Sequence, residues 1–225
     1  MHVLIVVSST NQVPGTQHKT GTWLEEFTAP YYVFTDAGAS VTVASPRGGA
    51  APIDPLSLSV DAQTDSTRRF ATDPKAQLVL NTTVKLDAVR AADYDALFYS
   101  GGLGPVFDLT DDPLSITLIE TLDRAARPVA AVCHGVAVLR HARKADGSAL
   151  VRARALTAFS NSEERAVGNV GRVPFMLEDE MVRLGARYSA AADGEVHVVT
   201  DGNLITGQNP ASSVEVAERV LALIR

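Results

Sequence analysis

The sequence contains a single cysteine, Cys133, among its 225 residues. One cysteine forms no disulfide within its own chain, and it cannot build a zinc site of the usual multi-cysteine kind. The other histidines show no metal-ligand spacing among themselves: His2, His18, His141 and His197. We therefore expect neither a metal nor a cofactor, and a reducing, cytoplasmic environment.

Excess basic charge and long apolar runs are missing as well. The formal net charge is −6, which leaves no basic surface large enough to neutralise a phosphate backbone. No stretch approaches the roughly 20 apolar residues of a membrane span, and the start MHVLIVVSS has neither a basic leader nor a small-residue cleavage site. We therefore expect neither nucleic acid nor a membrane as a partner, and nothing in the sequence directs export.

Apolar strand patterns alternate with helical patterns along the chain. The length suits one α/β domain over residues 1–225, and the 46% apolar fraction is typical of a soluble globular protein. Buried strands are predicted at HVLIVV, SVTVAS, YDALFYSGG and PVAAV. Helices are predicted within TWLEEFTAPYYVFTDAG, from Asp112 to Ala126, in VPFMLEDEMVRLGA, in SSVEVAERVLALIR and directly after PVAAVCHG. This alternation indicates parallel crossover units and a layered α/β sheet.

Three local patterns refine this prediction. Pro30 is expected to kink or divide the first helix. The segment from Pro46 to Asp73 is rich in turn-forming residues, so we expect a long surface excursion there that can include a short helix. Val196 to Gly207 is typical of a hairpin that turns at Asp201-Gly202.

Cys133 stands where ligands bind in open α/β sheets, just beyond the carboxyl end of a buried strand. It follows PVAAV directly and precedes a helical pattern, so its thiol should project from a tight turn at a helix N-terminus. Such a place stabilises the thiolate and lowers a thiol pKa from about 8.5 to roughly 3.5–7.5. The alternative is that Cys133 is only a small buried apolar residue, as most lone cysteines are.

Candidate acid-base residues accompany this cysteine. His134 is adjacent in sequence, but only the turn geometry decides where its ring points. The segment FSNSEER supplies Glu163 and Glu164 as orienting carboxylates, unless both are solvated loop charges. Glu25 and Glu26 lie on an otherwise apolar helix that must pack one face on the sheet. Either one of the two faces inward and has a raised pKa, or both form an acidic pair at the surface.

A second strand ends at Ser100-Gly101-Gly102. The two glycines permit positive φ and close backbone approach, so amides around them are candidate donors to a developing oxyanion. A purely structural turn is the alternative. The segment SGGLGP is a poor phosphate loop, because it lacks both the Walker lysine and the dinucleotide glycine spacing.

Several segments, in this order, resemble the PfpI superfamily of intracellular-protease and amidotransferase-like proteins: TGTWLEEFTAPYYVF, SVTVASPRGG, YDALFYSGGLGPVFDL, AAVCHG, FSNSEE, PFMLEDEM and DGNLITGQNPASS. The most similar branch holds heat-shock-protein-31-like chaperones and cofactor-independent glyoxalase III enzymes. The resemblance implies a flavodoxin-like three-layer sandwich with a mostly parallel sheet and a small β-hairpin. Family members are often dimers, so a homodimer is allowed, although no patch of the sequence specifies an interface.

The resemblance also assigns roles. It implies that Cys133 is the nucleophile, that His134 is its acid-base partner, and that Glu26 contacts the thiol. Glu164, in preference to Glu163, would orient His134. Backbone amides around four residues would bind the oxyanion and the substrate: Gly101, Gly102, Leu103 and His134.

Two comparisons with the superfamily pattern narrow the function. Many relatives have Gly-Gly-His-Gly where this chain has Gly102-Leu103-Gly104, which removes a polar contact above the thiol and bears on substrate identity. Glutamine amidotransferases use a late His-x-Glu pair, but here the late His197 is followed by Val198 and Val199. Release of ammonia from glutamine is therefore not expected.

The resemblance predicts a glyoxalase III-like lyase of the D-lactate dehydratase type. Such an enzyme converts methylglyoxal or a similar small 2-oxoaldehyde to a 2-hydroxy acid through a cysteine hemithioacetal. The alternatives are a stress-related holdase or cysteine-oxidation sensor, and a cysteine hydrolase or hydratase of the same superfamily.

Overall fold

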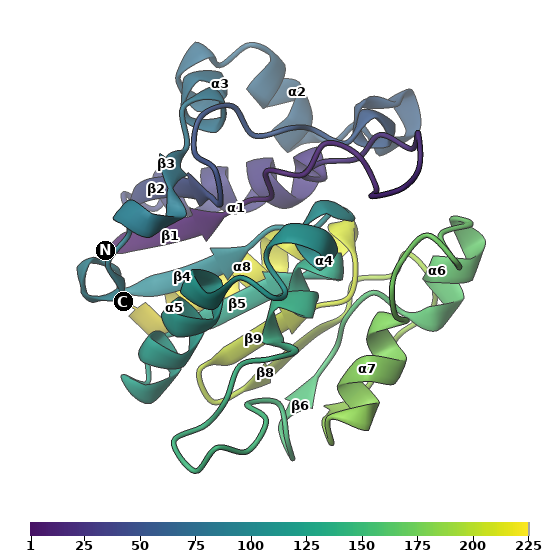
Figure 1. Ribbon diagram of the computed structural model, residues 1–225. Helices are drawn as coiled ribbons and strands as arrows, with labels where there is room; N and C mark the ends of the chain where they lie inside the picture. Colours follow the sequence, from purple (N-terminus) through teal and green to yellow (C-terminus); the bar gives the residue numbers. More distant parts are fainter. Residues whose placement is uncertain (225) are drawn as a thin grey trace.

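A seven-stranded sheet with the order β3-β2-β1-β4-β5-β9-β8 forms the centre of the computed structural model, which describes residues 1–224 (Figure 1). All neighbouring strands of this sheet are parallel except β8 and β9, which form the predicted hairpin. The strands are β1 His2–Val6, β2 Ser40–Ser45, β3 Val84–Lys85, β4 Ala96–Tyr99, β5 Val129–Val132, β8 Val198–Asp201 and β9 Leu204–Gly207. A separate two-stranded sheet pairs β6 Ala155–Leu156 with β7 Arg187–Tyr188.

Helices cover the sheet and complete the predicted layers. The α-helices are α1 Leu24–Asp36, α2 Asp65–Ala71, α3 Pro74–Asn81, α4 Gly104–Asp108, α5 Pro113–Arg124, α6 Asn161–Ala166, α7 Leu177–Arg183 and α8 Ser213–Ile224. The helices α1 and α8 pack on each other and on the sheet, and α5 packs on β4 and β5 (Figure 1). Because β1, β4 and β5 lie between such layers, their side chains are almost completely buried, and the strands are continuous apolar runs. The α/β sandwich with a mostly parallel sheet is thus confirmed.

The excursion after β2 is more ordered than its composition indicates. It contains the 3₁₀ helices η1 Pro55–Leu58 and η2 Val60–Ala62, followed by α2 and the start of α3. Local capping explains these helices: Thr64 forms a capping box with Thr67, and the Asp73 carboxylate accepts from two amides at the start of α3. The excursion therefore contains the short helix that was expected, α2, and two 3₁₀ helices besides.

Pro30 was expected to kink or divide the first helix, and division is wrong, because α1 continues from Leu24 to Asp36. A further expectation about a helix was also wrong. The segment after β5 is not an α-helix but the 3₁₀ helix η5 Cys133–Leu139, which is completely buried. Within residues 1–224, every helix is too short or too polar to span a lipid bilayer.

Candidate active site

Cys133 occupies a sharp elbow between β5 and η5. Its φ is +57°, a value that residues with side chains rarely adopt and that persists only where the surroundings enforce it. The elbow is tight because Gly135 packs against the end of β4: a Cβ there would lie 2.8 Å from the Tyr99 carbonyl oxygen and 2.9 Å from that of Ser100. The sequence Cys-His-Gly therefore turns at once after the strand, and the sulfur stays almost buried, with Cys133 only 4% exposed.

A cleft of about 670 Å³ opens beside this elbow. Its lining includes residues that directly follow β4, β5 and β9, so the cleft lies beyond the carboxyl ends of parallel strands, as expected for this class of sheet. Apolar side chains form much of its wall: Trp23, Leu56, Leu103, Phe159 and Val167. Its size suits a small organic ligand.

His134 connects the thiol to a carboxylate. Its Nδ1 lies 3.4 Å from Cys133 Sγ, and its Nε2 lies 2.8 Å from Glu164 Oε2. The imidazole is 4% exposed and Glu164 is 1% exposed, so water does not compete for these contacts. The Phe159 ring packs against the imidazole with centroids 4.5 Å apart. The order sulfur, imidazole, carboxylate is that of a nucleophile, its base and the group that orients the base.

Glu163 has a different position from its neighbour. One of its carboxylate oxygens accepts from Ser160 and Gln208, and the other accepts from the Gly194 amide and from Asn209. Four of these donors are N–H groups, so Glu163 acts as an acceptor that connects the start of α6 with Gly194 and with the adjacent residues Gln208 and Asn209. Both Glu163 and Glu164 are buried, which excludes the alternative of solvated loop charges.

Glu26 is a second carboxyl group close to the Cys133 sulfur, separate from the His134–Glu164 pair. It is fully buried, its Oε2 accepts from the Gly101 amide over 2.7 Å, and its Oε1 has no hydrogen-bond partner among residues 1–224. Burial raises the pKa of this carboxyl to about 8, although the neighbouring Cys133 and the Gly101 amide oppose the rise. Glu26 therefore holds its proton near neutral pH.

The turn after β4 is built around this carboxyl. A Cβ at position 101 would overlap Glu26 Oε2 and lie 2.8 Å from the Val132 carbonyl oxygen, so only glycine fits. Gly102 has φ +85°, the left-handed region that favours glycine, and a Cβ there would overlap the Gly21 carbonyl oxygen. Gly101 is therefore required by the close approach of Glu26, and Gly102 is required both by its positive φ and by the close approach of Gly21.

The thiol does not have the lowered pKa that its place in the sequence predicted. Burial raises the pKa of Cys133 well above its usual value, and Glu26 raises it further. The prediction failed because η5 is a short, buried 3₁₀ helix, and the loss of water around the sulfur outweighs any dipole at its start. The resting thiol is therefore protonated, and its reaction needs a base.

The amides of the turn after β4 differ in availability. The Gly101 amide is bound to Glu26, so it does not point to a ligand, and its prediction as an oxyanion donor was wrong. The amides of Gly102 and Leu103 donate to no other group within residues 1–224, and both residues line the cleft. These two amides are the ones that a bound oxyanion could reach.

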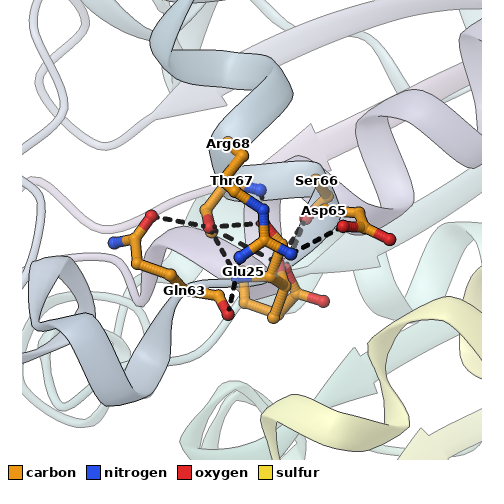
Figure 2. A network of polar contacts seen from close by, with 7 residues as sticks. Glu25, Gln63, Asp65, Ser66, Thr67 and Arg68 are labelled. Carbon is orange, nitrogen blue, oxygen red and sulfur yellow. Dashed lines mark hydrogen bonds and ion pairs between the residues drawn. The ribbon is translucent and has the colours of Figure 1, made fainter.

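Glu25, the neighbour of Glu26, was not expected to be buried as well. Its carboxylate accepts from the hydroxyls of Thr64 and Ser66, which holds the segment from Gln63 to Arg68 against α1 (Figure 2). Burial also raises the pKa of Glu25. Because Glu25 and Thr64 line the cleft, this network fixes one of its walls.

The likeness of this chain to known proteins extends over most of its length. Residues 19–223 match the model of the DJ-1/PfpI family. The chain belongs to the DJ-1/PfpI family. It is 30% identical to the human glutamine amidotransferase-like class 1 domain-containing protein 1. The 192 aligned residues cover 85% of this chain and 84% of the relative.

Other members of the DJ-1/PfpI family match almost the entire chain. Glyoxalase 3 of Candida albicans is 27% identical over 233 residues, with 98% of this chain and 97% of the relative covered. Its solved structure, called glyoxalase III, has a TM-score of 0.91 at 26% identity and covers 100% of this chain and 98% of its own. The structure of the Rapid Encystment Protein of 24 kDa from Francisella tularensis has a TM-score of 0.94 at 33% identity, with 100% and 99% covered. The predicted superfamily is confirmed.

Proposed function

We propose that this protein is a glyoxalase III-like enzyme that converts methylglyoxal or a similar 2-oxoaldehyde to a 2-hydroxy acid. Cys133 is the nucleophile, His134 its base, Glu164 the residue that orients the base, and Glu26 a second proton carrier. The observation that carries the proposal is the contact series from Cys133 Sγ through His134 to Glu164, at the edge of a small-molecule cleft. Relatives named glyoxalase support the substrate class.

The first step is addition of the thiol to the aldehyde. The sulfur forms a bond to the aldehyde carbon as His134 Nδ1 takes the thiol proton, and Glu164 stabilises the imidazolium. The aldehyde oxygen gains negative charge and accepts hydrogen bonds from the Gly102 and Leu103 amides. It then takes the proton that Glu26 holds near neutral pH, which leaves Glu26 ionised and His134 as the imidazolium. The product is a hemithioacetal. A base is essential because the pKa of the resting thiol is raised.

The second step moves one proton between two carbon atoms. The ionised Glu26 removes the proton from the sulfur-bearing carbon while the His134 imidazolium protonates the neighbouring ketone oxygen, which gives an enediol. Glu26 then returns the proton to the neighbouring carbon, and the hydroxyl group of the first carbon gives its proton to His134, which leaves a thioester. The first carbon is oxidised and the second is reduced by two electrons each, so no external oxidant or reductant is needed. Glu26, whose pKa of about 8 makes it a stronger base than an ordinary carboxyl once ionised, suits this transfer. Water then cleaves the thioester, which releases the 2-hydroxy acid and restores the thiol.

The alternative of a cysteine-oxidation sensor has less support. Sensor cysteines are accessible and have a low pKa, whereas Cys133 is 4% exposed and its pKa is raised. A hydrolase or hydratase of the same superfamily would use the same nucleophile on another substrate, so a substrate screen separates it from a glyoxalase.

The experiment is a screen of the wild type and Cys133→Ala against 2-oxoaldehydes, isonitriles and peptides. We expect the wild type to convert methylglyoxal to lactate without glutathione, and the variant to lose at least about 10³-fold in kcat/KM. Circular dichroism of both proteins verifies the fold. Lactate formation that survives in Cys133→Ala, or turnover of isonitriles or peptides alone, would overturn the proposal.

A further inference from the structure

The cleft beside Cys133 contains carboxylates and no counterpart of opposite charge. Among residues 1–224, no lysine or arginine lines it, whereas five acidic residues do: Glu25, Asp54, Asp61, Glu163 and Asp193. Within the described part of the chain, none of the five forms a salt bridge. The negative charge is therefore not neutralised by neighbouring side chains.

The contacts and the exposure of these residues fit a negative cleft. N–H groups donate to both oxygens of Glu163, an arrangement that favours a carboxylate over a protonated carboxyl. Asp61 and Asp193 are exposed, and each contributes one formal negative charge. Glu25 contributes less, because burial raises its pKa.

The two histidines of the lining do not reverse this sign. His134 bonds to Glu164, so even its protonated form is balanced by that carboxylate. His18 is one partly exposed imidazole against several carboxylates. A cleft with one sign of charge and apolar walls concentrates its field on the ligand.

We propose that this cleft selects its substrates by charge, so that it admits uncharged or cationic aldehydes and rejects those that carry a carboxylate or a phosphate. The inference rests on the proposed function for its aldehyde chemistry. It also assigns a part in turnover to the same carboxylates. The reaction starts from an uncharged 2-oxoaldehyde and ends with a 2-hydroxy carboxylate, so the charge that excludes anionic substrates also repels the product. Weak product inhibition follows.

The single cysteine allows a test that does not depend on turnover. Iodoacetamide and iodoacetate are similar in size and alkylate the same sulfur, but only iodoacetate is an anion. Both react with the thiolate, so the ratio of their rate constants is independent of the pKa of the thiol. We expect the ratio of the iodoacetamide rate to the iodoacetate rate to be at least about tenfold higher in the folded protein than in urea. The ratio should fall towards the urea value in about 1 M salt, where the screening length is about 3 Å.

Variants separate the effect of the cleft carboxylates from that of Glu26, which lies beside the sulfur and repels an anion whenever it is ionised. Asp61→Asn and Asp193→Asn remove exposed charges of the lining, and each should lower the ratio, with the double variant lowering it most. The matched control is Glu218→Gln, which removes an exposed carboxylate of α8 that is not part of the lining. A ratio equal to that in urea, or one that Glu218→Gln lowers as much as the cleft variants do, would overturn the proposal.

Turnover gives the second arm of the test. We expect kcat/KM for 4-carboxyphenylglyoxal to be at least about tenfold below that for its uncharged counterpart, 4-carbamoylphenylglyoxal, at low salt. The difference should shrink as salt is added. Equal values at every salt concentration contradict charge selection while the glyoxalase function stands. If neither these compounds nor methylglyoxal is converted but the alkylation ratio shows the predicted selection, the glyoxalase function fails and the charge selection of the cleft stands.

Discussion

Ser100 donates its hydroxyl hydrogen to the main-chain carbonyl of Glu26 over 2.9 Å. In an uninterrupted helix this carbonyl would accept from the amide four residues later, but that residue is Pro30, which has no N–H. The next residue after Ser100, Gly101, donates to the carboxylate of the same glutamate. The end of β4 thus fixes Glu26 at its main chain and at its side chain, and all these groups are buried.

This relationship predicts an energetic coupling between Ser100 and Pro30. Ser100→Ala leaves a buried carbonyl without a donor, which should cost about 1–3 kcal/mol in the free energy of unfolding. In a Pro30→Ala background the helix regains an N–H for that carbonyl, so the same change should cost less. Urea unfolding of the four proteins in this double-mutant cycle measures the coupling. Strictly additive effects would show that the two residues do not share the Glu26 carbonyl.

Ser100 is also expected to act as a positioning residue for Glu26. If Ser100→Ala allows the carboxyl to move, the pH profile of kcat/KM should change together with its maximum value, and Pro30→Ala should restore both. A purely structural contact would change stability and leave the pH profile of the folded enzyme unchanged.

Glu26 itself predicts an unusual pH dependence of stability. Its folded pKa is about 8, above the unfolded value near 4.5, so between these values the folded state keeps a proton that the unfolded state has lost. The free energy of unfolding contributed by this residue therefore falls as the pH rises from about 4.5 to about 8, and is lowest above that range. Glu26→Gln should remove this slope, so that the variant gains stability relative to the wild type by a few kcal/mol across the interval.

Urea unfolding at several pH values between 5 and 8.5 measures the difference between wild type and Glu26→Gln. Glu218→Gln is the control, because it removes an exposed carboxylate and should follow the wild-type slope. The same Glu26→Gln variant should lose most of its turnover if Glu26 carries a proton in the reaction. A difference that does not depend on pH would contradict the raised pKa.

The adjacent residues Glu163 and Glu164 should respond oppositely to the same substitution. Glu164→Gln keeps an oxygen for the His134 N–H but removes the charge that stabilises the imidazolium, so kcat/KM should fall by at least about 10²-fold with a small change in stability. Glu163→Gln places an amide among four N–H donors, and the two donors that met the replaced oxygen lose their acceptor, so the main effect should be a loss of at least about 1–3 kcal/mol in stability. Steady-state kinetics and thermal unfolding of both variants test this, and a reversed pattern would exchange the two roles.

The sequence alone predicted those features that depend on local pattern. The strands β1, β2, β4 and β5, the turn at Cys133, the hairpin of β8 and β9 and the α/β layers all follow from apolar periodicity and turn residues near each other in the chain, whereas the two-residue strands β3 and β6 were not predicted. The resemblance to a family added the preference for Glu164 over Glu163, and in the structure it is Glu164 that contacts His134. The catalytic roles themselves stay predictions.

What the sequence did not predict depends on contacts between distant segments. The spacing after Cys133 is helical, but Gly135 packs so closely on the carbonyls of β4 that η5 winds as a 3₁₀ helix. The direction of the thiol pKa shift depends on burial and on Glu26, which approaches from another helix. The commitment of the Gly101 amide to Glu26 likewise exists only in three dimensions.

A final prediction compares Gly101, which lies in the site, with Gly38, which lies far from it in the sequence. Substitution by alanine should affect turnover at the first position and stability at the second. Gly101 has no positive φ, so Gly101→Ala introduces little backbone strain, but its Cβ would overlap the Glu26 carboxylate and lie 3.1 Å from Cys133 Cβ. Gly38 has φ +80° with open space around its Cα, so Gly38→Ala introduces backbone strain of about 1–2 kcal/mol and touches nothing in the cleft. We therefore expect Gly101→Ala to lower kcat/KM by at least about 10²-fold, because a small displacement of reacting groups is sufficient for such a loss. Gly38→Ala should lower the melting temperature while kcat/KM stays at the wild-type value. If Gly101→Ala retained full turnover, Glu26 could not be held in contact with the turn after β4 during the reaction, and its proposed proton transfer would have to be assigned to His134 alone.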